Sequence, residues 1–381
     1  MKWGIKGKIV TPQEVIPGLV VIRENYIEDI IPYPESEDLE VIYNFENDFI
    51  FPGLIDLHLH GLRGEDVTEG GIRSIQKISA LLPSFGVTSF LPTTLTADLA
   101  TLFKVIEEAK SWRGASSLGA RILGLHLEGP YLSEGRKGAQ DPAYLRKPHQ
   151  EEIKSLIQKG EGVIKRITIA PELPGALEAI EYLAQHDVLV SLGHSEADYQ
   201  TSQQAWERGA KMVTHLFNGM DPLHHRQPNL LAFALGNDEI YAEIIADKIH
   251  VKPEIMKIAL KCKAPDHLFI ISDALKVTNL PEGVYELGGQ KVEVRGRMAY
   301  LPSGTLAGST FLLNQMLYNL KELFSLSLPE LAKMGSFIPA QLVGKDKELG
   351  SIEKGKIADV VVFDDCFQAQ ATFINGIKVG G

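Results

Sequence analysis

Cysteine is nearly absent from this sequence. Only Cys262 and Cys366 occur among its 381 residues, far apart and in no paired motif. A disulfide framework and a cysteine-based zinc ribbon are therefore excluded. Because so few cysteines fit a reducing compartment, we expect the protein to be cytoplasmic.

Long apolar runs and an excess of positive charge are also missing. No segment approaches the apolar stretch that a membrane helix needs, and residues 1–6 lack the apolar core of a signal peptide. The net charge of −11 argues against nucleic acid as a partner, because binding it requires neutralised phosphates. We therefore expect no membrane and no nucleic-acid partner. A small anionic ligand fits only where positive groups cluster locally.

From Ile50 onward, apolar strands alternate with amphipathic segments. Eight strands are predicted, at Leu54–Leu57, Thr88–Leu91, Ile122–Leu127, Ile164–Ile169, Leu189–Leu192, Met212–His215, Tyr241–Ala246 and Leu268–Ser272. Helices are predicted between them, at Ile72–Leu82, Asp98–Trp112, Glu151–Gln158, Ala176–Gln185, Asp198–Glu207 and Pro253–Lys261. Such alternation indicates a parallel sheet covered by helices. Eight units in about 230 residues predict an α/β fold of the (β/α)₈ TIM-barrel type.

Short strands occupy both ends of the chain. They are predicted at Gly4–Val10, Leu19–Arg23, Tyr26–Pro32 and Val41–Phe45, and again within residues 350–364 and 371–379. Before the tail, a hairpin is predicted at Val284–Leu301 and helices at Ser309–Phe324 and Leu328–Leu342. We therefore predict two domains. Residues 1–50 and 345–381 form a small β-sandwich, and residues 51–344 form the barrel.

Histidines and carboxylates fall at the ends of the predicted barrel strands. The first strand ends in a His-x-His pair whose side chains share a face and can converge on one metal ion. The six residues at five strand ends are His58, His60, Glu128, His194, His215 and Asp273. Barrel chemistry collects at the C-terminal ends of strands. A metal site is therefore favoured over separate structural hydrogen bonds.

These donors suit zinc or ferrous iron, because magnesium and calcium prefer oxygen ligands. A cation in such a site generates hydroxide from water and polarises a carbonyl. Asp273 is the natural general base, which takes a proton from the attacking water and passes it to the leaving group. The predicted reaction is metal-assisted hydrolysis, with an amide as the favoured substrate.

The motifs that carry these residues resemble the amidohydrolase superfamily, and within it the N-acetylglucosamine-6-phosphate deacetylases. The resemblance rests in part on PGLIDLHLHG at 52–61, GLHLEGPY at 124–131, GHS at 193–195 and SDA at 272–274, of which the His-x-His, Glu-Gly-Pro and Ser-Asp-Ala pieces are widely shared. Narrower pieces are HLFNGM at 215–220, PLHHR at 222–226 and GTLAGS at 304–309. The resemblance covers nearly the whole chain, and it implies a sugar-phosphate substrate and a homodimer or larger homo-oligomer.

The resemblance also implies roles for matched residues. Glu128, His194 and His215 hold the metal that all members keep, and His58 and His60 with shared carboxylates can hold a second; we expect two ions. Asp273 is the acid/base. The implied substrate contacts are Ala139, Gln140, Asn218, Gly219, Arg226, Asp247, His250, Leu306, Ala307 and Gly308. Arg226 and His250 take the phosphate, and the forked guanidinium of arginine suits this.

Two positions depart from the family pattern. Gln140 stands where members usually have a histidine, and its amide can donate a hydrogen bond but cannot carry a proton. Lys248 stands where members usually have a glycine. Both departures bear on the identity of the sugar more than on the chemistry.

Alternatives accompany these predictions. Asp56 either orients an imidazole or makes a structural hydrogen bond, and for His126 we favour a packed or hydrogen-bonded role. The same site could hydrolyse another N-acylated sugar phosphate, such as N-acetylgalactosamine 6-phosphate, an N-acyl amino acid or a cyclic amide. A non-catalytic barrel would have lost ligands or Asp273, and this sequence has lost neither.

Overall fold

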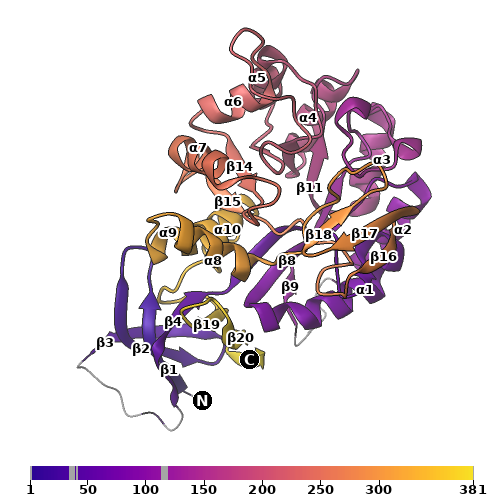
Figure 1. Cartoon of the computed structure of the whole chain (residues 1–381). Coiled ribbons are helices and arrows are strands. Elements are labelled where there is room, and N and C mark those ends of the chain that lie inside the picture. Colours follow the sequence, from indigo (N-terminus) through magenta and orange to yellow (C-terminus); the bar gives the residue numbers. More distant parts are fainter. Residues whose placement is uncertain (1, 34–38, 40–41, 113–118, 381) are drawn as a thin grey trace.

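The protein is described by a computed structural model over residues 2–33, 39, 42–112 and 119–380. Its centre is a parallel sheet that wraps into a nearly closed barrel (Figure 1). The barrel strands, in sequence order, are β5 (Leu54–Leu59), β8 (Val87–Thr94), β10 (Leu125–Glu128), β11 (Ile164–Ile169), β12 (Leu189–Leu192), β13 (Met212–Val213), β14 (Tyr241–Ile244) and β15 (Leu268–Ile270). All eight predicted strands are confirmed, and neighbours in the sequence are neighbours in the sheet.

The first and last barrel strands meet beyond the end of β15. Asp273 N donates to His58 O, and His60 N donates to Ala274 O, each at 2.9 Å. Leu59 and Ala274 form a parallel bridge there. This seam completes the barrel at the end where the candidate site residues lie.

Helices cover the outside of the barrel. They are α1 (Val67–Leu81), α2 (Leu99–Lys110), α3 (Gln150–Gly160), α4 (Ala176–Gln185), α5 (Tyr199–Glu207), α6 (Leu230–Gly236), α7 (Pro253–Lys263) and α8 (Leu313–Leu323). The side chains of Asp98 and Asp198 cap the N-termini of α2 and α5. Helix α6 was not predicted, because its sequence LLAFALG has no polar face to give a helical period.

Two predicted elements are interrupted. The third strand divides into β9 (Arg121–Ile122) and β10 around Gly124, whose φ of 144° suits glycine. The helix predicted at Leu328–Leu342 consists of α9 (Leu328–Ala332), the π-helical turn η4 (Lys333–Phe337) and α10 (Ile338–Leu342).

The two ends of the chain join in one seven-stranded sheet beside α8 to α10 (Figure 1). Its strands are β1 (Lys2–Val10), β2 (Val15–Arg23), β3 (Tyr26–Pro32), β4 (Ile42–Pro52), β19 (Val360–Phe363), β20 (Ala369–Ile374) and β21 (Ile377–Gly380). Residues of both ends, such as Ile5, Val20 and Phe373, share a core of their own. The predicted start of a strand at Val41 lies outside the described residues. The predicted boundary between residues 50 and 51 falls inside β4, which runs to Pro52, and only Gly53 separates β4 from β5. The domain boundaries therefore stay a prediction.

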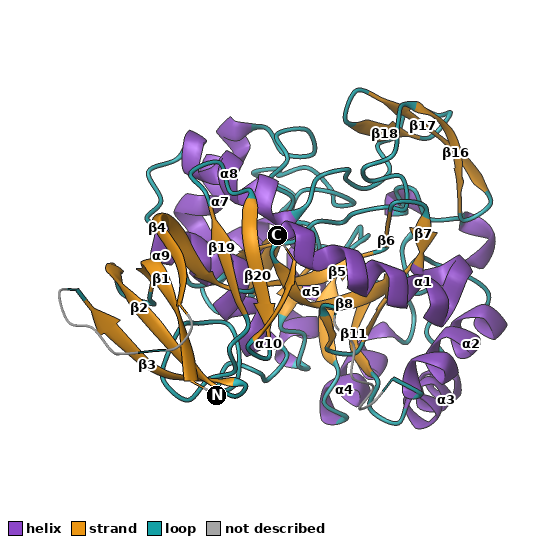
Figure 2. Cartoon of the chain, turned by 90° about the horizontal axis from the view of Figure 1, so that it is seen from below, coloured by secondary structure: helices purple, strands orange, loops and turns teal. Residues whose placement is uncertain are grey.

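Two small sheets complete the strands. The predicted hairpin is a three-stranded sheet of β16 (Gly283–Leu287), β17 (Gln290–Arg295) and β18 (Met298–Tyr300), which projects from the barrel on the side away from β1 to β3 (Figure 2). Leu287 packs in one cluster with Leu95 and Leu275. The other sheet pairs β6 (Gly61–Leu62) with β7 (Glu65–Asp66).

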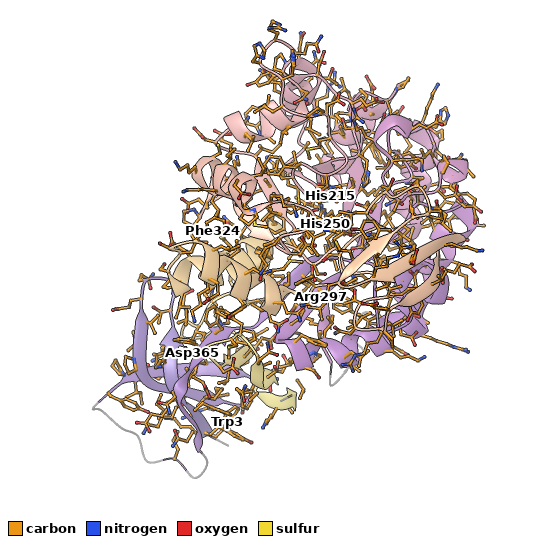
Figure 3. All side chains as sticks on the ribbon, in the orientation of Figure 1. Trp3, His215, His250, Arg297, Phe324 and Asp365 are labelled. Carbon is orange, nitrogen blue, oxygen red and sulfur yellow. The ribbon has the colours of Figure 1, made fainter. Side chains whose placement is uncertain are left out.

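Side chains divide between these regions. In Figure 3, His215 and His250 lie at the barrel, whereas Trp3, on β1, and Asp365 lie in the region of the seven-stranded sheet. Among the described residues, no helix is both long and apolar enough to cross a membrane.

The junction between the two sheets leaves no room for a side chain at Gly53. A Cβ atom there would lie 2.1 Å from Thr88 Oγ1 and 2.4 Å from Thr88 Cγ2. We expect Gly53→Ala to cost about 1–3 kcal/mol of stability through overpacking, visible as a lower midpoint of thermal unfolding. Gly236→Ala is the control, because its Cβ would meet nothing within 4 Å. Equal midpoints for the two variants would contradict this packing at the junction.

Candidate metal centre and catalytic cavity

Four histidines turn their Nε2 atoms toward one another at the C-terminal end of the barrel. His58 Nε2 lies 3.1 Å from His60 Nε2, and His194 Nε2 lies 3.0 Å from His215 Nε2. Each Nδ1 faces an acceptor, namely Glu243 Oε1 for His58 (2.9 Å), Thr93 O for His60 (3.1 Å), Arg136 O for His194 (2.8 Å) and Asn218 O for His215 (3.0 Å). A proton on each Nδ1 satisfies these acceptors. The four Nε2 lone pairs then point into the same space.

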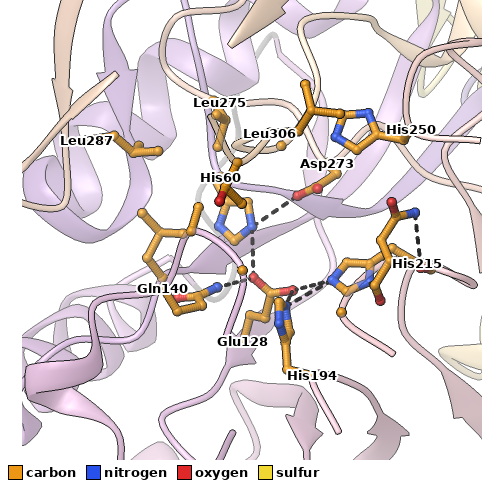
Figure 4. Close-up of a pocket in the computed structure, with 17 residues that line it drawn as sticks. His60, Glu128, Gln140, His194, His215, His250, Asp273, Leu275, Leu287 and Leu306 are labelled. Atoms are coloured by element: carbon orange, nitrogen blue, oxygen red, sulfur yellow. Dashed lines mark hydrogen bonds and ion pairs between the residues drawn. The ribbon is translucent and has the colours of Figure 1, made fainter. Parts of the chain in front are cut away.

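Two carboxylates complete this cluster. Glu128 Oε1 lies 3.2 Å from His194 Nε2 and 3.1 Å from His215 Nε2, and Glu128 Oε2 lies 3.2 Å from His60 Nε2 (Figure 4). Asp273 Oδ1 lies 3.3 Å from His60 Nε2. Two groups can each hold an ion, one formed by His58, His60 and Asp273 and the other by Glu128, His194 and His215.

The cluster fits a divalent cation. Lone pairs that face each other at about 3 Å repel unless a positive charge lies between them. Burial alone lowers the pKa of His58 and His60, but Glu128, Asp273 and, for His58, Glu243 outweigh it and raise the pKa to about 10 and about 9. The site therefore attracts positive charge, which protons or a metal ion can supply. Imidazole and carboxylate donors suit zinc or ferrous iron.

The chain turns sharply at three of these residues. The backbone φ is 49° at His194, 30° at His215 and 48° at Asp273, all outside the range that ordinary side chains prefer. Each residue follows the end of a barrel strand, where the left-handed turn brings its side chain inward. Strain of this kind is concentrated at functional sites.

Behind the cluster lies a buried ion pair that the sequence analysis did not single out. Glu243 on β14 and Arg166 on β11 are fully buried and 2.6 Å apart. Burial raises the pKa of Glu243, but Arg166 and His58 outweigh it and lower the pKa to about 2. The available signal was the presence of charged residues within two predicted barrel strands, Lys165 and Arg166 in β11 and Glu243 in β14.

Gln140 contacts one of the candidate metal ligands. Its Nε2 donates to Glu128 Oε2 at 2.5 Å, and its Oε1 accepts from Thr96 N at 2.7 Å. The two bonds fix the orientation of the amide, so its nitrogen faces the cluster. One N–H of the Gln140 amide remains beyond the bond to Glu128.

A cavity of about 200 Å³ opens above the cluster (Figure 4). It is lined by His60, Leu95, Glu128, Gly138, Ala139, Gln140, His194, His215, Asn218, Gly219, His250, Asp273, Leu275, Leu287, Thr305, Leu306 and Gly308. Most of the predicted substrate contacts are therefore brought together. His58 lies beneath His60 and is fully buried.

Three predicted substrate contacts do not line the cavity. Asp247 instead accepts from His250 Nδ1 at 2.7 Å and so fixes that ring. Ala307 is buried, and its backbone N bonds to Ala299 O. Arg226 is exposed, and its Nη1 lies 2.7 Å from His225 Nε2.

Sequence reasoning missed the apolar wall of the cavity. Leu95, Leu275 and Leu287 line it, together with Gly138 and Thr305. Leu275 follows Asp273 by two residues, so the predicted site at Asp273 could have indicated that Leu275 lies near the cavity. The contact of Leu287 with the cavity could not be predicted, because the alternation of polar and apolar residues along a hairpin does not show which part of the protein the hairpin packs against.

The structure gives the hydrogen-bond partners of His126 and Asp56, the two residues for which the sequence left alternative roles open. His126 Nε2 lies 2.8 Å from Thr168 Oγ1 and its Nδ1 lies 3.2 Å from Thr93 Oγ1, so the favoured hydrogen-bonded role agrees with its position. Asp56 Oδ1 accepts from the backbone N–H groups of His58 and Ser272, each at 3.2 Å. Burial raises the pKa of Asp56 to about 6.

The geometry predicts that the His-x-His pair sets the number of ions. We expect His58→Asn/His60→Gln to bind one metal ion fewer per chain than the wild type, measured by elemental analysis after growth with ample zinc or iron. His126→Gln is the matched control, because His126 is equally buried beside His58 but faces threonine hydroxyls. Equal metal content in all three proteins would mean that the strand supplies shape only.

Comparison with known proteins shows the family of this chain. Residues 49–379 match the amidohydrolase family. The chain is 38% identical to an N-acetylglucosamine-6-phosphate deacetylase of Bacillus subtilis, over 94% of this chain and 92% of that protein. It is 35% identical to an N-acetylgalactosamine-6-phosphate deacetylase of Escherichia coli O157:H7, over 93% of each. A crystal structure of N-acetylglucosamine-6-phosphate deacetylase from Pasteurella multocida superposes over the full length of both chains, with a TM-score of 0.95 and 29% identity. The chain therefore belongs to the amidohydrolase family and, within it, groups with the N-acetylglucosamine-6-phosphate deacetylases.

Proposed function

We propose that this protein hydrolyses the acetamide of N-acetylglucosamine 6-phosphate, giving glucosamine 6-phosphate and acetate. The observation that carries the proposal is the convergence of four imidazole Nε2 atoms, Glu128 and Asp273 at the floor of one cavity. The names of the relatives supply the substrate. The two exposed free cysteines are compatible with the cytoplasm as its compartment.

Two divalent ions, zinc or ferrous iron, belong to the proposal. Glu128, His194 and His215 would hold one, and His58, His60 and Asp273 would hold the other. Such an ion supplies Lewis acidity toward the amide carbonyl and lowers the pKa of water.

Asp273 is the proposed general base and acid. Burial raises its pKa, but His58 and His60 outweigh this, so the pKa is lowered and the carboxylate is ionised at neutral pH. It takes a proton from the attacking water and gives one to the amine nitrogen as the C–N bond breaks. Asp273 lines the cavity, so in this proposal its carboxylate can reach both the attacking water and the amine nitrogen of the substrate.

Gln140 takes the position of the expected histidine without its charge. One N–H of its amide is used by Glu128, and the other is free to donate to the acetyl carbonyl oxygen. Thr96 N holds the amide in this orientation. Polarisation of the carbonyl by Gln140 is therefore a hydrogen bond with no proton transfer.

His250 is the proposed phosphate contact within the chain. Burial lowers its pKa, but Asp247 outweighs this and raises it, which favours the charged imidazolium. Asn218, Gly219 and Leu306 enclose the sugar in this proposal. Arg226 lies outside the cavity of its own chain, so the predicted homodimer would have to bring Arg226 of the partner subunit to the phosphate.

A second candidate substrate is N-acetylgalactosamine 6-phosphate. The relative from Escherichia coli O157:H7 carries that activity in its name at 35% identity. An N-acyl amino acid is less favoured, because it would leave His250 without a phosphate to bind.

Acetate release from N-acetylglucosamine, N-acetylglucosamine 6-phosphate and N-acetylgalactosamine 6-phosphate tests the proposal. We expect the highest kcat/KM on N-acetylglucosamine 6-phosphate, with the unphosphorylated sugar poorest because His250 gains no ionic contact. Equal rates with and without phosphate would contradict the phosphate site. A higher value for the galactosamine compound would replace the first substrate by the second.

Asp273→Asn tests the proton relay. We expect kcat to fall about 10²–10⁴-fold, the contribution typical of general acid–base catalysis, while the ion at Glu128, His194 and His215 is retained. Asp56→Asn is the control, since that carboxyl faces backbone N–H groups and not the cavity. Metal content and kcat are measured on both variants. Wild-type kcat in Asp273→Asn would assign the base to another residue.

A further inference from the structure

Glu243 lies in the interior of the barrel with no exposed surface. Its Oε2 lies 2.6 Å from Arg166 Nη1. The guanidinium is held in turn by Leu57 O at 3.2 Å and by Ser191 Oγ and Thr214 Oγ1 at 3.1 Å. These contacts come from separate barrel strands or the turns after them, so they fix the position of one carboxylate oxygen.

The other oxygen of Glu243 touches both candidate metal groups. Oε1 lies 2.9 Å from His58 Nδ1, in the group of His58, His60 and Asp273. The same oxygen accepts from the backbone N–H of His215 at 2.8 Å, in the group of Glu128, His194 and His215. One atom therefore contacts a ring in the first group and a main chain in the second.

We propose that Glu243, anchored by Arg166, is a positioning residue shared by the two metal groups. It fixes the ring of His58 and the backbone turn at His215, and so sets the two groups relative to each other. The inference rests on the metal sites of the proposed function.

The chemistry of the two contacts supports this role. An ionised carboxylate only accepts hydrogen bonds, so the proton of His58 stays on Nδ1 and its Nε2 lone pair faces the cluster. At His215 the backbone φ of 30° is strained, and the bond from its N–H to Glu243 stabilises that turn. The other three imidazoles use backbone carbonyl oxygens for their Nδ1 atoms. In this cluster only the His58 ring depends on a side chain that a mutation can change.

A purely structural ion pair is the competing explanation, and the chain contains a matched example. Asp359 accepts from Arg121 Nη2 at 3.2 Å and from Asn375 N at 2.8 Å, and it is buried. It resembles Glu243 in its partners, but neither Asp359 nor Arg121 is a candidate metal ligand or lines the cavity.

Glu243→Gln separates the two explanations. The glutamine amide has one acceptor and one donor end. If its oxygen faces Arg166, its NH₂ meets the donors of His58 and His215; if its oxygen faces these, its NH₂ meets the guanidinium. Either way one set of contacts is lost, with no change in the number of heavy atoms.

The test titrates zinc into metal-free wild type, Glu243→Gln and Asp359→Asn by equilibrium dialysis against chelator-buffered zinc. Metal content per chain and the unfolding midpoint of each metal-free protein are recorded. In Glu243→Gln we expect binding of the ion at His58 and His60 to weaken about 10- to 100-fold, the usual effect of losing such a partner. In Asp359→Asn we expect both zinc affinities to match the wild type, even if the midpoint falls.

Unchanged zinc affinities in Glu243→Gln, or an equal loss in Asp359→Asn, would overturn the inference. If Glu243→Gln does not fold, Glu243→Asp decides. It keeps the negative charge for Arg166 but is one methylene shorter, so it is expected to weaken the same ion, and unchanged binding would again overturn the inference. Wild-type protein that binds no zinc or iron would contradict the metal sites themselves, a result distinct from either outcome for the variants.

Discussion

The hydrogen bonds at the four Nδ1 atoms are the constraint on which the site depends. A neutral imidazole has one donor and one acceptor nitrogen, so each acceptor behind a ring decides which nitrogen faces the cavity. Three of these acceptors are backbone carbonyls, of Thr93, Arg136 and Asn218, and the fourth is Glu243. The barrel places all four, so the chemistry of the rings follows from the path of the main chain.

Much of this could be predicted from the sequence, for physical reasons. Parallel barrel strands are buried on both faces and read as apolar runs, and catalytic side chains follow their C-terminal ends. The positions of His194, His215 and Asp273 in the site could therefore be predicted once the barrel strands had been assigned. The pairing of Arg166 with Glu243 could not be predicted, because it depends on which strands face each other across the interior. Helix α6 and the position of Leu287 also depend on tertiary packing, which the local periodicity of apolar residues does not reveal.

Gln140 departs from the family pattern, and its two hydrogen bonds show how the amide is held in place of a histidine ring. The sequence indicates a missing histidine, and therefore a missing charge. The structure adds that the amide bonds to Glu128 and to Thr96 N at once. A histidine ring presents two nitrogens at a fixed angle, whereas the amide places its oxygen and nitrogen side by side. The substitution thus exchanges a titratable group for one whose hydrogen bonds do not change with pH.

Three of the candidate metal ligands lie at the seam where the first and last strands of the barrel meet. His58 lies on the first strand, β5, His60 directly follows that strand, and Asp273 follows the last strand. The backbones of His58 and Asp273 are joined there by a hydrogen bond. Ser272 and His58, also in contact at the seam, are 214 residues apart in the sequence. An ion held by His58, His60 and Asp273 would act as a clasp across this seam. Its binding energy would then count toward closing a very long loop of chain, so loss of that ion would loosen the barrel at its one junction between first and last strands.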